Sequence, residues 1–470
     1  MALPVTHRVP FRGRRTAVAP ATCAQRHMWN LMERQLPDAA FYNVCHWVDL
    51  PGRGTAQELL AVFAELLGRH ESLRTGFSRT PDGALVQRVA ESGRFEAEVW
   101  TIDHGEDKES VLHAWRLRMR HSPFEPARAP LVRFMVTVAD GAPVLAGFCV
   151  SHLAADLMSL RLLADETSRL LDAASAGRPF PPAVPSRQPV EQAWFERSPR
   201  GQALLRRAHA YWRRQLASAP ATLFPVRDGT GGRSAGTDGG STAAVRHSAA
   251  LDSRAVALAL PVLARHWRVS TSAVLLTVVA QFLGRRAGSS SCTLRLLTAN
   301  RSDPELRGTV ANLHAEVAVT VDLEGDRVED IARRAFAACT AAYANGLYDP
   351  DEVTDLFEAA TRERGVPVDL SYCFNDIRAG HGPPEAAGDR ASRVTGEALR
   401  MAMADTVVAS HEFEEGETFF LVIDDEELGW VRLVLNADTR ALTPSEVRGF
   451  LYDVERALVE HAEHAVADGL

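Results

Sequence analysis

One histidine and one carboxylate stand where they could do acid–base chemistry together. The segment Ser151-His152-Leu153-Ala154-Ala155-Asp156-Leu157 follows an apolar run, Val144 to Val150, which favours a buried strand. Asp156 precedes a stretch with apolar residues at helical spacing, where a short acceptor side chain can cap a helix. A neutral imidazole can accept a proton near pH 7, so His152 is the candidate catalytic base.

Spacing alone does not single out His152. The same His-x-x-x-acid pattern occurs at His121/Glu125, His381/Glu385, His411/Glu415 and His464/Asp468. His464 lies among the last residues, where fraying is expected. Only His152 has an apolar strand before it and an amphipathic helix after it, although a satisfied core histidine remains the alternative.

The segment must be held by predicted strands and helices, which alternate along the whole chain. Leu131–Val138 and Val144–Val150 predict two paired strands joined by a turn at residues 139–142, and a helix should run from Asp156 to about Ala174. Residues 1–20 are expected to be irregular. Helices and strands alternate in both halves of the chain, which predicts an α/β (α+β) protein with two lobes.

The lobe boundary is predicted from composition. Residues 228–245 are too rich in Gly and Ser to pack and indicate a flexible linker. The expected division is therefore an N-terminal lobe over 1–227, which carries the His-x-x-x-Asp motif, and a C-terminal lobe over 246–470. A chain of 470 residues is long enough for two such lobes.

Charge and cysteine content exclude several classes of function. The net charge of −8 gives no basic field for nucleic acid, and no apolar run approaches a membrane span of about 20 residues. The six cysteines lack metal-ligand spacing, so we expect no metal and mostly buried free thiols in a reducing cytoplasm. No apolar region follows the basic N-terminus, which argues against a secretory signal.

A second segment indicates a family. Arg69-His70-Glu71-Ser72-Leu73-Arg74-Thr75-Gly76-Phe77 matches the signature Arg-His-Glu-x-Leu-Arg-Thr-x-Phe of nonribosomal peptide synthetase condensation domains without a mismatch. The segment at 151–157 resembles their His-His-x-x-x-Asp-Gly motif, with Ser151 for the first His and Leu157 for the Gly. Other family segments are similar to residues 22–31, 130–133, 211–216 and 300–306, in that order along the chain.

The resemblance implies a fold and a reaction. Two lobes like chloramphenicol acetyltransferase would form a V with a tunnel between them. A carrier protein would bring the donor thioester on its phosphopantetheine arm, so the chain itself would bind no cofactor. His152 takes the place of the functional histidine, and the acceptor would be a small molecule or carrier-bound amine, or less readily a hydroxyl.

The resemblance also assigns the neighbours of His152. Asp156 would be structural, because a buried carboxylate needs a cation. Its partner arginine could be Arg26, Arg74 or Arg301, and Arg74 is taken as structural at the site. Ser159 could stabilise an oxyanion or only cap the helix. Ser151 would be a tolerable structural replacement, while Leu157 could narrow a channel or line an acyl pocket.

Two functions stay open at this point. The first is an active, free-standing condensation enzyme that meets an acyl or peptidyl carrier protein in trans, since no adenylation or carrier segment is visible. The second is a degenerate platform that recruits carriers or tailoring enzymes. The platform is suggested by Ser151, Leu157 and Ala315, the last of which replaces the Asn of a second-lobe motif. An epimerase of the same superfamily is a weaker third alternative.

Overall fold

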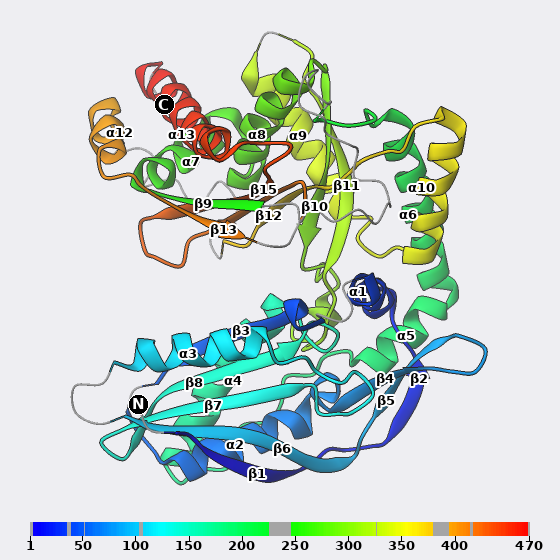
Figure 1. Cartoon of the computed structure of the whole chain (residues 1–470), viewed down its shortest axis with the longest axis vertical. Coiled ribbons are helices and arrows are strands. Elements are labelled where there is room, and N and C mark those ends of the chain that lie inside the picture. Colours follow the sequence, from blue (N-terminus) through cyan, green and yellow to red (C-terminus); the bar gives the residue numbers. More distant parts are fainter. Residues whose placement is uncertain are drawn as a thin grey trace. The chain divides into compact units, whose positions relative to one another are not determined.

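The chain divides by its internal contacts into two compact units, each a mixture of helices and strands (Figure 1). The computed structural model describes residues 3–34, 39–50, 52–102, 107–224, 246–325, 327–378, 394–413 and 417–468. Unit 1 comprises Met1–Arg206, Ala299–Ala315 and Leu347–Asp351, and unit 2 comprises Arg207–Thr298, Glu316–Gly346 and Glu352–Leu470. Both units are discontinuous, unlike the expected ranges 1–227 and 246–470. The predicted linker, 228–245, lies outside the described residues and stays a prediction.

Unit 1 contains two sheets. Its strands are β1 (Val5–Arg12), β2 (Ala17–Pro20), β3 (Asn43–Asp49), β4 (Thr75–Arg79), β5 (Leu85–Val89), β6 (Ser92–Ile102), β7 (Val132–Ala139) and β8 (Ala142–Ser151). The larger sheet has the order β1-β6-β7-β8-β3, and the smaller has the order β2-β5-β4. Its helical segments are α1 (Cys23–Arg34), η1 (Ala39–Tyr42), α2 (Ala56–Arg69), η2 (Glu71–Arg74), α3 (Lys108–Arg120), α4 (Leu157–Ser175), α5 (Pro189–Arg197), η3 (Pro304–Leu306) and the start of α6 (Pro199–Ser218).

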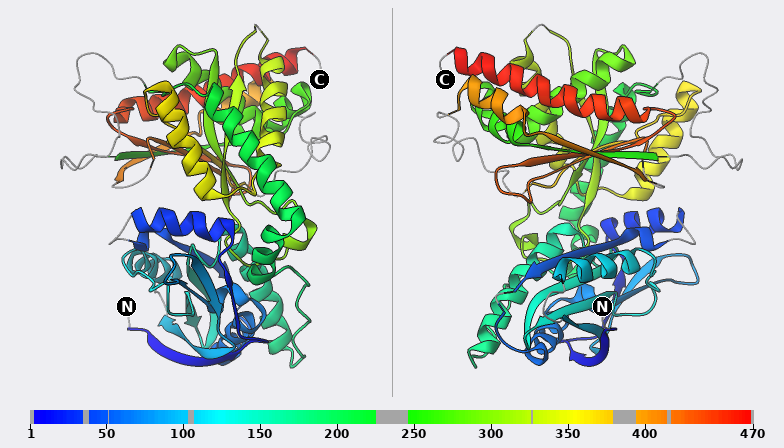
Figure 2. Two further views of the ribbon diagram at one scale, coloured as in Figure 1. Left: turned by 90° about the vertical axis from the view of Figure 1, so that its right-hand side faces the viewer. Right: turned by 60° about the vertical axis from the view of Figure 1, so that its left-hand side comes forward.

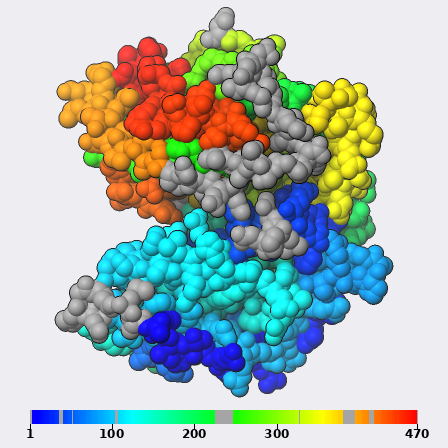
Figure 3. Space-filling view, in the orientation of Figure 1, coloured from blue at the N-terminus to red at the C-terminus, as the bar shows by residue number. Residues whose placement is uncertain are grey.

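Helices pack on both faces of the larger sheet. Thr55 and Glu58 form a capping box that starts α2, and Phe63 of α2 stacks on Phe134 of β7 with ring centroids 4.2 Å apart. Helix α4 packs beside α2. On the opposite face lies α3, whose Trp115 sits against Gly147 of β8. Helix α3, coloured cyan, has its outer side at the surface of the molecule (Figure 3).

The β7–β8 hairpin brings the chain to the candidate site. Asp140 and Gly141 both have left-handed φ angles, 51° and 80°, as a tight hairpin turn requires. The strands pair antiparallel with Phe134 opposite Phe148. The two strands and the turn predicted here are confirmed, with ends that differ by one or two residues.

The prediction for residues 1–20 was wrong, since β1 and β2 lie in this segment. β1 pairs antiparallel with β6, from Val5 opposite Val99 to Arg12 opposite Ser92. As an edge strand, β1 tolerates Pro10 and several basic residues, which hide the alternation that usually marks a strand. Its partner is far along the chain, so no local pattern indicated the pairing.

Unit 2 is built on one mixed sheet with the order β11-β10-β12-β14-β15-β9-β13. The strands are β9 (Arg246–Ser253), β10 (Ser291–Thr298), β11 (Ala315–Asp322), β12 (Tyr372–Asp376), β13 (Val407–Phe413), β14 (Phe419–Asp424) and β15 (Val431–Asp438). The helices are α7 (Arg254–Trp267), α8 (Thr271–Ala287), α9 (Val328–Tyr343), α10 (Pro350–Arg364), α12 (Gly396–Met403) and α13 (Pro444–Ala467). Helices α7, α8 and α13 lie together on one face of the sheet (Figure 2).

Within the described ranges, no single helix is long and apolar enough to cross a membrane. Taken together, helices α7 and α8 have the length and apolar composition of a membrane span, but the chain bends by 96° between them.

Helix α3 allows a matched test of core packing. Leu112 is 2% exposed and belongs to the core of unit 1, whereas Leu117 on the same helix is 46% exposed. We expect Leu112→Ala to cost about 2–5 kcal/mol through lost burial and a cavity, and Leu117→Ala to cost less than about 1 kcal/mol. Urea unfolding midpoints measure both. Equal shifts would contradict the packing described for α3.

Candidate active site

The turn between β8 and α4 fixes the backbone of His152. The carbonyl of Ser151 accepts hydrogen bonds from the amides of Ala154 and Ala155, at 2.8 and 3.3 Å. The amide of His152 donates to the carbonyl of Tyr42 at 2.9 Å. Ser151 is buried, so its role in the described contacts is to shape the turn through its backbone.

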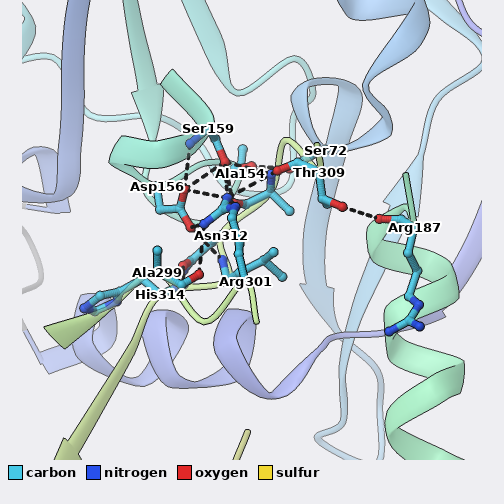
Figure 4. A network of polar contacts seen from close by, with 12 residues as sticks. Ser72, Ala154, Asp156, Ser159, Arg187, Ala299, Arg301, Thr309, Asn312 and His314 are labelled. Carbon is cyan, nitrogen blue, oxygen red and sulfur yellow. Dashed lines mark hydrogen bonds and ion pairs between the residues drawn. The ribbon is translucent and has the colours of Figure 1, made fainter. Parts of the chain in front are cut away.

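Asp156 is held by five hydrogen bonds (Figure 4). Two guanidinium nitrogens of Arg301 donate to its two carboxylate oxygens, both at 2.8 Å. The amides of Ser159 and Leu313 donate at 2.8 and 3.0 Å, and the Ser159 hydroxyl lies 2.8 Å from Oδ1. A carboxylate so engaged cannot also act on a substrate, which supports the structural role expected for it.

The electrostatics of Asp156 follow from these contacts. Burial by itself would raise the pKa of this carboxyl, but the Arg301 charge and the hydrogen bonds lower the pKa of Asp156 below its usual range. Both partners are almost fully buried, with side chains 7% and 5% exposed. The pair is therefore a desolvated ion pair in which each charge depends on the other.

The structure selects Arg301 among the three candidate arginines. Arg26 pairs instead with Asp349 at 2.7 Å, and also contacts Asp351. The placement of Arg74 at the site is corrected: its guanidinium donates to the carbonyls of Leu67, Arg15 and Ala90. A cation buried among carbonyls serves the scaffold of unit 1, and Arg74 makes no described hydrogen bond with Asp156.

Ser159 has no hydrogen-bonding capacity left for an oxyanion. Its hydroxyl oxygen accepts from Arg301 at 2.9 Å and from the amide of Ala311 at 3.0 Å. Its single proton lies within reach of Asp156 Oδ1, at 2.8 Å, and of the Ala311 carbonyl, at 2.7 Å. The residue is fully buried, and Asp156 rather than Ser159 caps α4, accepting from the Ser159 amide. The Ser159 hydroxyl instead links Asp156 to Arg301 and Ala311.

Leu157 is the first residue of α4 and is half-buried. It is not among the non-glycine residues with left-handed φ angles, so the glycine expected at this position is not needed for backbone conformation. Any influence of Leu157 on the site must therefore come from its side chain. A role in a channel or an acyl pocket stays a prediction.

The His152 imidazole has an unexpected neighbour in His314. Their ring centroids are 5.5 Å apart, and His27 follows at 6.3 Å from His314. Burial and the nearby His314 lower the pKa of His152 to about 4, although Asp156 acts in the opposite direction. At neutral pH the ring is therefore uncharged and available as a hydrogen-bond acceptor.

Sequence reasoning missed His314. His314 directly precedes Ala315, at a position that the second-lobe family motif leaves open to any residue. The available signal was the histidine itself, an ionisable residue between two apolar ones just before β11. No group of three or more His, Cys, Asp or Glu side chains suited to a metal ion occurs in the described part of the chain.

The Arg69–Phe77 segment supports the site without joining it. Arg69 and His70 both contact Glu166 of α4, at 2.6 and 2.7 Å. Ser72 donates to the carbonyl of Ala154 in the His152 turn, and the amide of Leu131 donates to the carbonyl of Leu73. Although burial opposes it, hydrogen bonds from His70 and Arg69 lower the pKa of Glu166 to about 2. This motif anchors both the turn and α4.

Removal of the Arg301 charge tests the ion pair. We expect Arg301→Met to destabilise the protein by about 3–5 kcal/mol, because Asp156 stays buried without a cation. Arg8→Met is the control, since Arg8 pairs with Glu96 on the surface of the same unit and should cost only about 0–1 kcal/mol. Urea unfolding followed by tryptophan fluorescence compares them. A mild effect for both variants would show that Asp156 finds other partners.

The titration of His152 tests the role of His314. We expect a midpoint near pH 4 by NMR of ¹⁵N-histidine-labelled protein, with the signal assigned from a His152→Gln variant. In His314→Asn the neighbour cannot become charged, so the midpoint should move up toward 6.5. Because unfolded histidine binds protons at higher pH, acidification from 6.5 to about 4 should also destabilise the fold through His152. An unchanged midpoint in His314→Asn would exclude this coupling.

Comparisons with known proteins agree on one family. The family model "Condensation domain" matches residues 15–365. The chain is 28% identical over 368 residues to cyclosporin synthetase of Tolypocladium inflatum, with 75% of this chain but only 2% of that synthetase covered. The curated relatives are thus far longer than the matched region.

Solved structures share the fold. A variant of the starter condensation domain of rhizomide synthetase, in complex with C8-CoA, matches with a TM-score of 0.69 at 17% identity, covering 95% of each chain. The SgcC5 protein from Streptomyces globisporus matches with a TM-score of 0.69 at 18% identity, covering 94% of this chain and 98% of its own. The α/β architecture is that of the chloramphenicol acetyltransferase-like fold, and this chain belongs to the condensation domain family.

Proposed function

We propose that this protein transfers an acyl or aminoacyl group from a carrier-bound phosphopantetheine thioester to an amine, and less readily to a hydroxyl. The observation that carries the proposal is His152, an uncharged imidazole on a turn whose far end is fixed by the buried Asp156–Arg301 pair. Membership of the condensation domain family supports this class of reaction.

The reaction balances without any further reagent. The amine nitrogen forms a bond to the thioester carbonyl carbon, and the carbon–sulfur bond breaks. The nitrogen loses one proton, and the phosphopantetheine thiolate gains one as it leaves. We assign His152 as the group that accepts a hydrogen bond from the attacking amine and that can relay this proton.

The low pKa of His152 favours an orienting role. General-base catalysis is most effective when the pKa of the base lies near the working pH, and a pKa of about 4 lies well below it. A neutral imidazole still accepts a hydrogen bond and directs the nitrogen lone pair at the carbonyl. The thioester is already activated, so positioning supplies much of the rate.

We propose that phosphopantetheine arrives as part of the substrate, on a separate acyl or peptidyl carrier protein. The rhizomide synthetase domain in complex with C8-CoA is relevant because coenzyme A carries the same phosphopantetheine thioester arm. The SgcC5 chain is matched over 98% of its length, so the same fold occurs there in a chain of similar extent.

The test uses the full chain and a separate carrier protein loaded with an octanoyl thioester. Mass spectrometry follows loss of the acyl group from the carrier and formation of amide or ester with a panel of amines and alcohols. We expect product with the parent chain and a fall of about 10²–10⁴-fold in His152→Ala. His113→Ala is the control, because His113 is exposed on α3.

The outcomes separate the two functions. Product formed as fast by His152→Ala as by the parent would remove the role assigned to His152. If the parent binds the loaded carrier but forms no product with any acceptor, the recruitment platform is supported instead. Circular dichroism of each variant confirms that the fold is intact.

A further inference from the structure

Two cysteines face each other across the strands that lead to His152. Cys45 of β3 lies opposite Cys149 of β8 in the antiparallel register. The bonds from Leu50 N to Val144 O and from His152 N to Tyr42 O, both 2.9 Å, identify the hydrogen-bonded pairs of this ladder. Because such pairs alternate, Cys45 and Cys149 form a narrow, non-hydrogen-bonded pair with Cα atoms about 4.5 Å apart. That separation lies within the range that a disulfide spans, and both thiols are free.

Guanidinium groups surround this pair. Arg133 of β7 lies opposite Cys149 in register, so it shares a face with both thiols. Helix α3 covers this face, where Asn43 of β3 donates to the carbonyl of Met119 at 2.7 Å (Figure 1). Arg116 of α3 lies over the Trp47 ring at 4.7 Å. Asp49 lies on the same face of β3 as Cys45 and forms an ion pair with Lys108.

The two thiols differ in chemistry. A hydrogen bond from Cys149 and the charges of Arg116, Arg120 and Arg133 lower the pKa of the Cys45 thiol, and Cys45 is half-buried. The same hydrogen bond and burial raise the pKa of Cys149. Cys45 is therefore the more acidic thiol of the pair and the one that more readily supplies a nucleophilic thiolate. Burial raises the thiol pKa of the other cysteines, Cys23, Cys292, Cys339 and Cys373.

We propose that Cys45 and Cys149 form a peroxide-reactive dithiol site, which oxidation closes into a disulfide between β3 and β8. The Cys45 thiolate attacks one oxygen of hydrogen peroxide, the oxygen–oxygen bond breaks, and hydroxide leaves and takes up a proton to become water. Cys149 then attacks the sulfenic sulfur of Cys45, and the second oxygen leaves as water with the Cys149 proton. Two thiols are oxidised and one peroxide is reduced to two waters.

The site lies close to the candidate base. Cys149 is on the strand that ends at Ser151, and the His152 amide is bonded to Tyr42 at the head of β3. In a reducing compartment the pair stays open, since thiols persist there. Under peroxide the bond joins the two strands that carry the His152 turn.

Peroxide treatment of the reduced full chain tests the proposal. After treatment with hydrogen peroxide, free thiols are blocked with N-ethylmaleimide and the digest is examined by mass spectrometry. We expect a linked peptide pair containing Cys45 and Cys149, a fall from six free thiols to four, and recovery with dithiothreitol. Unlinked peptides with all six thiols free, under peroxide that oxidises a reference thiolate protein, would overturn the proposal.

Serine variants establish the order of attack. Cys149→Ser should trap the sulfenic acid on Cys45, which dimedone detects. Dimedone labelling of Cys45→Ser should be lower than that of Cys149→Ser by at least about tenfold. Cys339→Ser is the matched control and should form the disulfide as the parent does. If Cys149 in the Cys45→Ser variant is labelled as fast as Cys45 in the Cys149→Ser variant, the assignment of Cys45 as the reactive thiol is overturned.

Discussion

The buried ion pair between Asp156 and Arg301 is the constraint on which the site of unit 1 depends. Each charge would be costly to bury alone, and together they are stable only with hydrogen bonds that satisfy the remaining lone pairs and protons. The surrounding chain supplies these from Ser159, Leu313 and the carbonyls of Ala299 and Thr309. The pair therefore specifies one arrangement of the α4 N-terminus and the 299–315 segment. His152, four residues before Asp156, takes its position from this arrangement.

The candidate catalytic residues and the segment that carries the family signature lie in different parts of the chain, at 152–156 and 69–77. The described side chains of the Arg69–Phe77 segment bind the scaffold: Arg69 and His70 contact Glu166, and Ser72 donates to the carbonyl of Ala154. Arg74 belongs to this scaffold, where its guanidinium fills the space beside Gly13: a Cβ on Gly13 would lie 2.3 Å from it. A sequence signature can thus mark the support of a site as strongly as the site itself.

The sequence predicted the local parts of this structure well. The strand before His152, the turn at Asp140-Gly141 and the cap at Asp156 all follow from patterns within a few residues. Edge strand β1 was not predicted, because its apolar and polar residues alternate only weakly and because its hydrogen-bonding partner β6 lies far along the chain. The partner of Asp156 could not be ranked, since three arginines were available and only tertiary packing distinguishes them. The proximity of His314 to His152 also depends on tertiary packing, so the sequence did not indicate it.

The discontinuity of unit 1 has a consequence during synthesis of the chain. Arg301 and Leu313, which complete the shell around Asp156, follow it by 145 and 157 residues. While the ribosome is still making the intervening segment, the carboxylate at the head of α4 has no guanidinium to meet. The shell around Asp156 can therefore be completed only after the chain beyond residue 313 has emerged. For the same reason, a hybrid protein joined within residues 207–298 would combine an Asp156 from one parent with an Arg301 from the other.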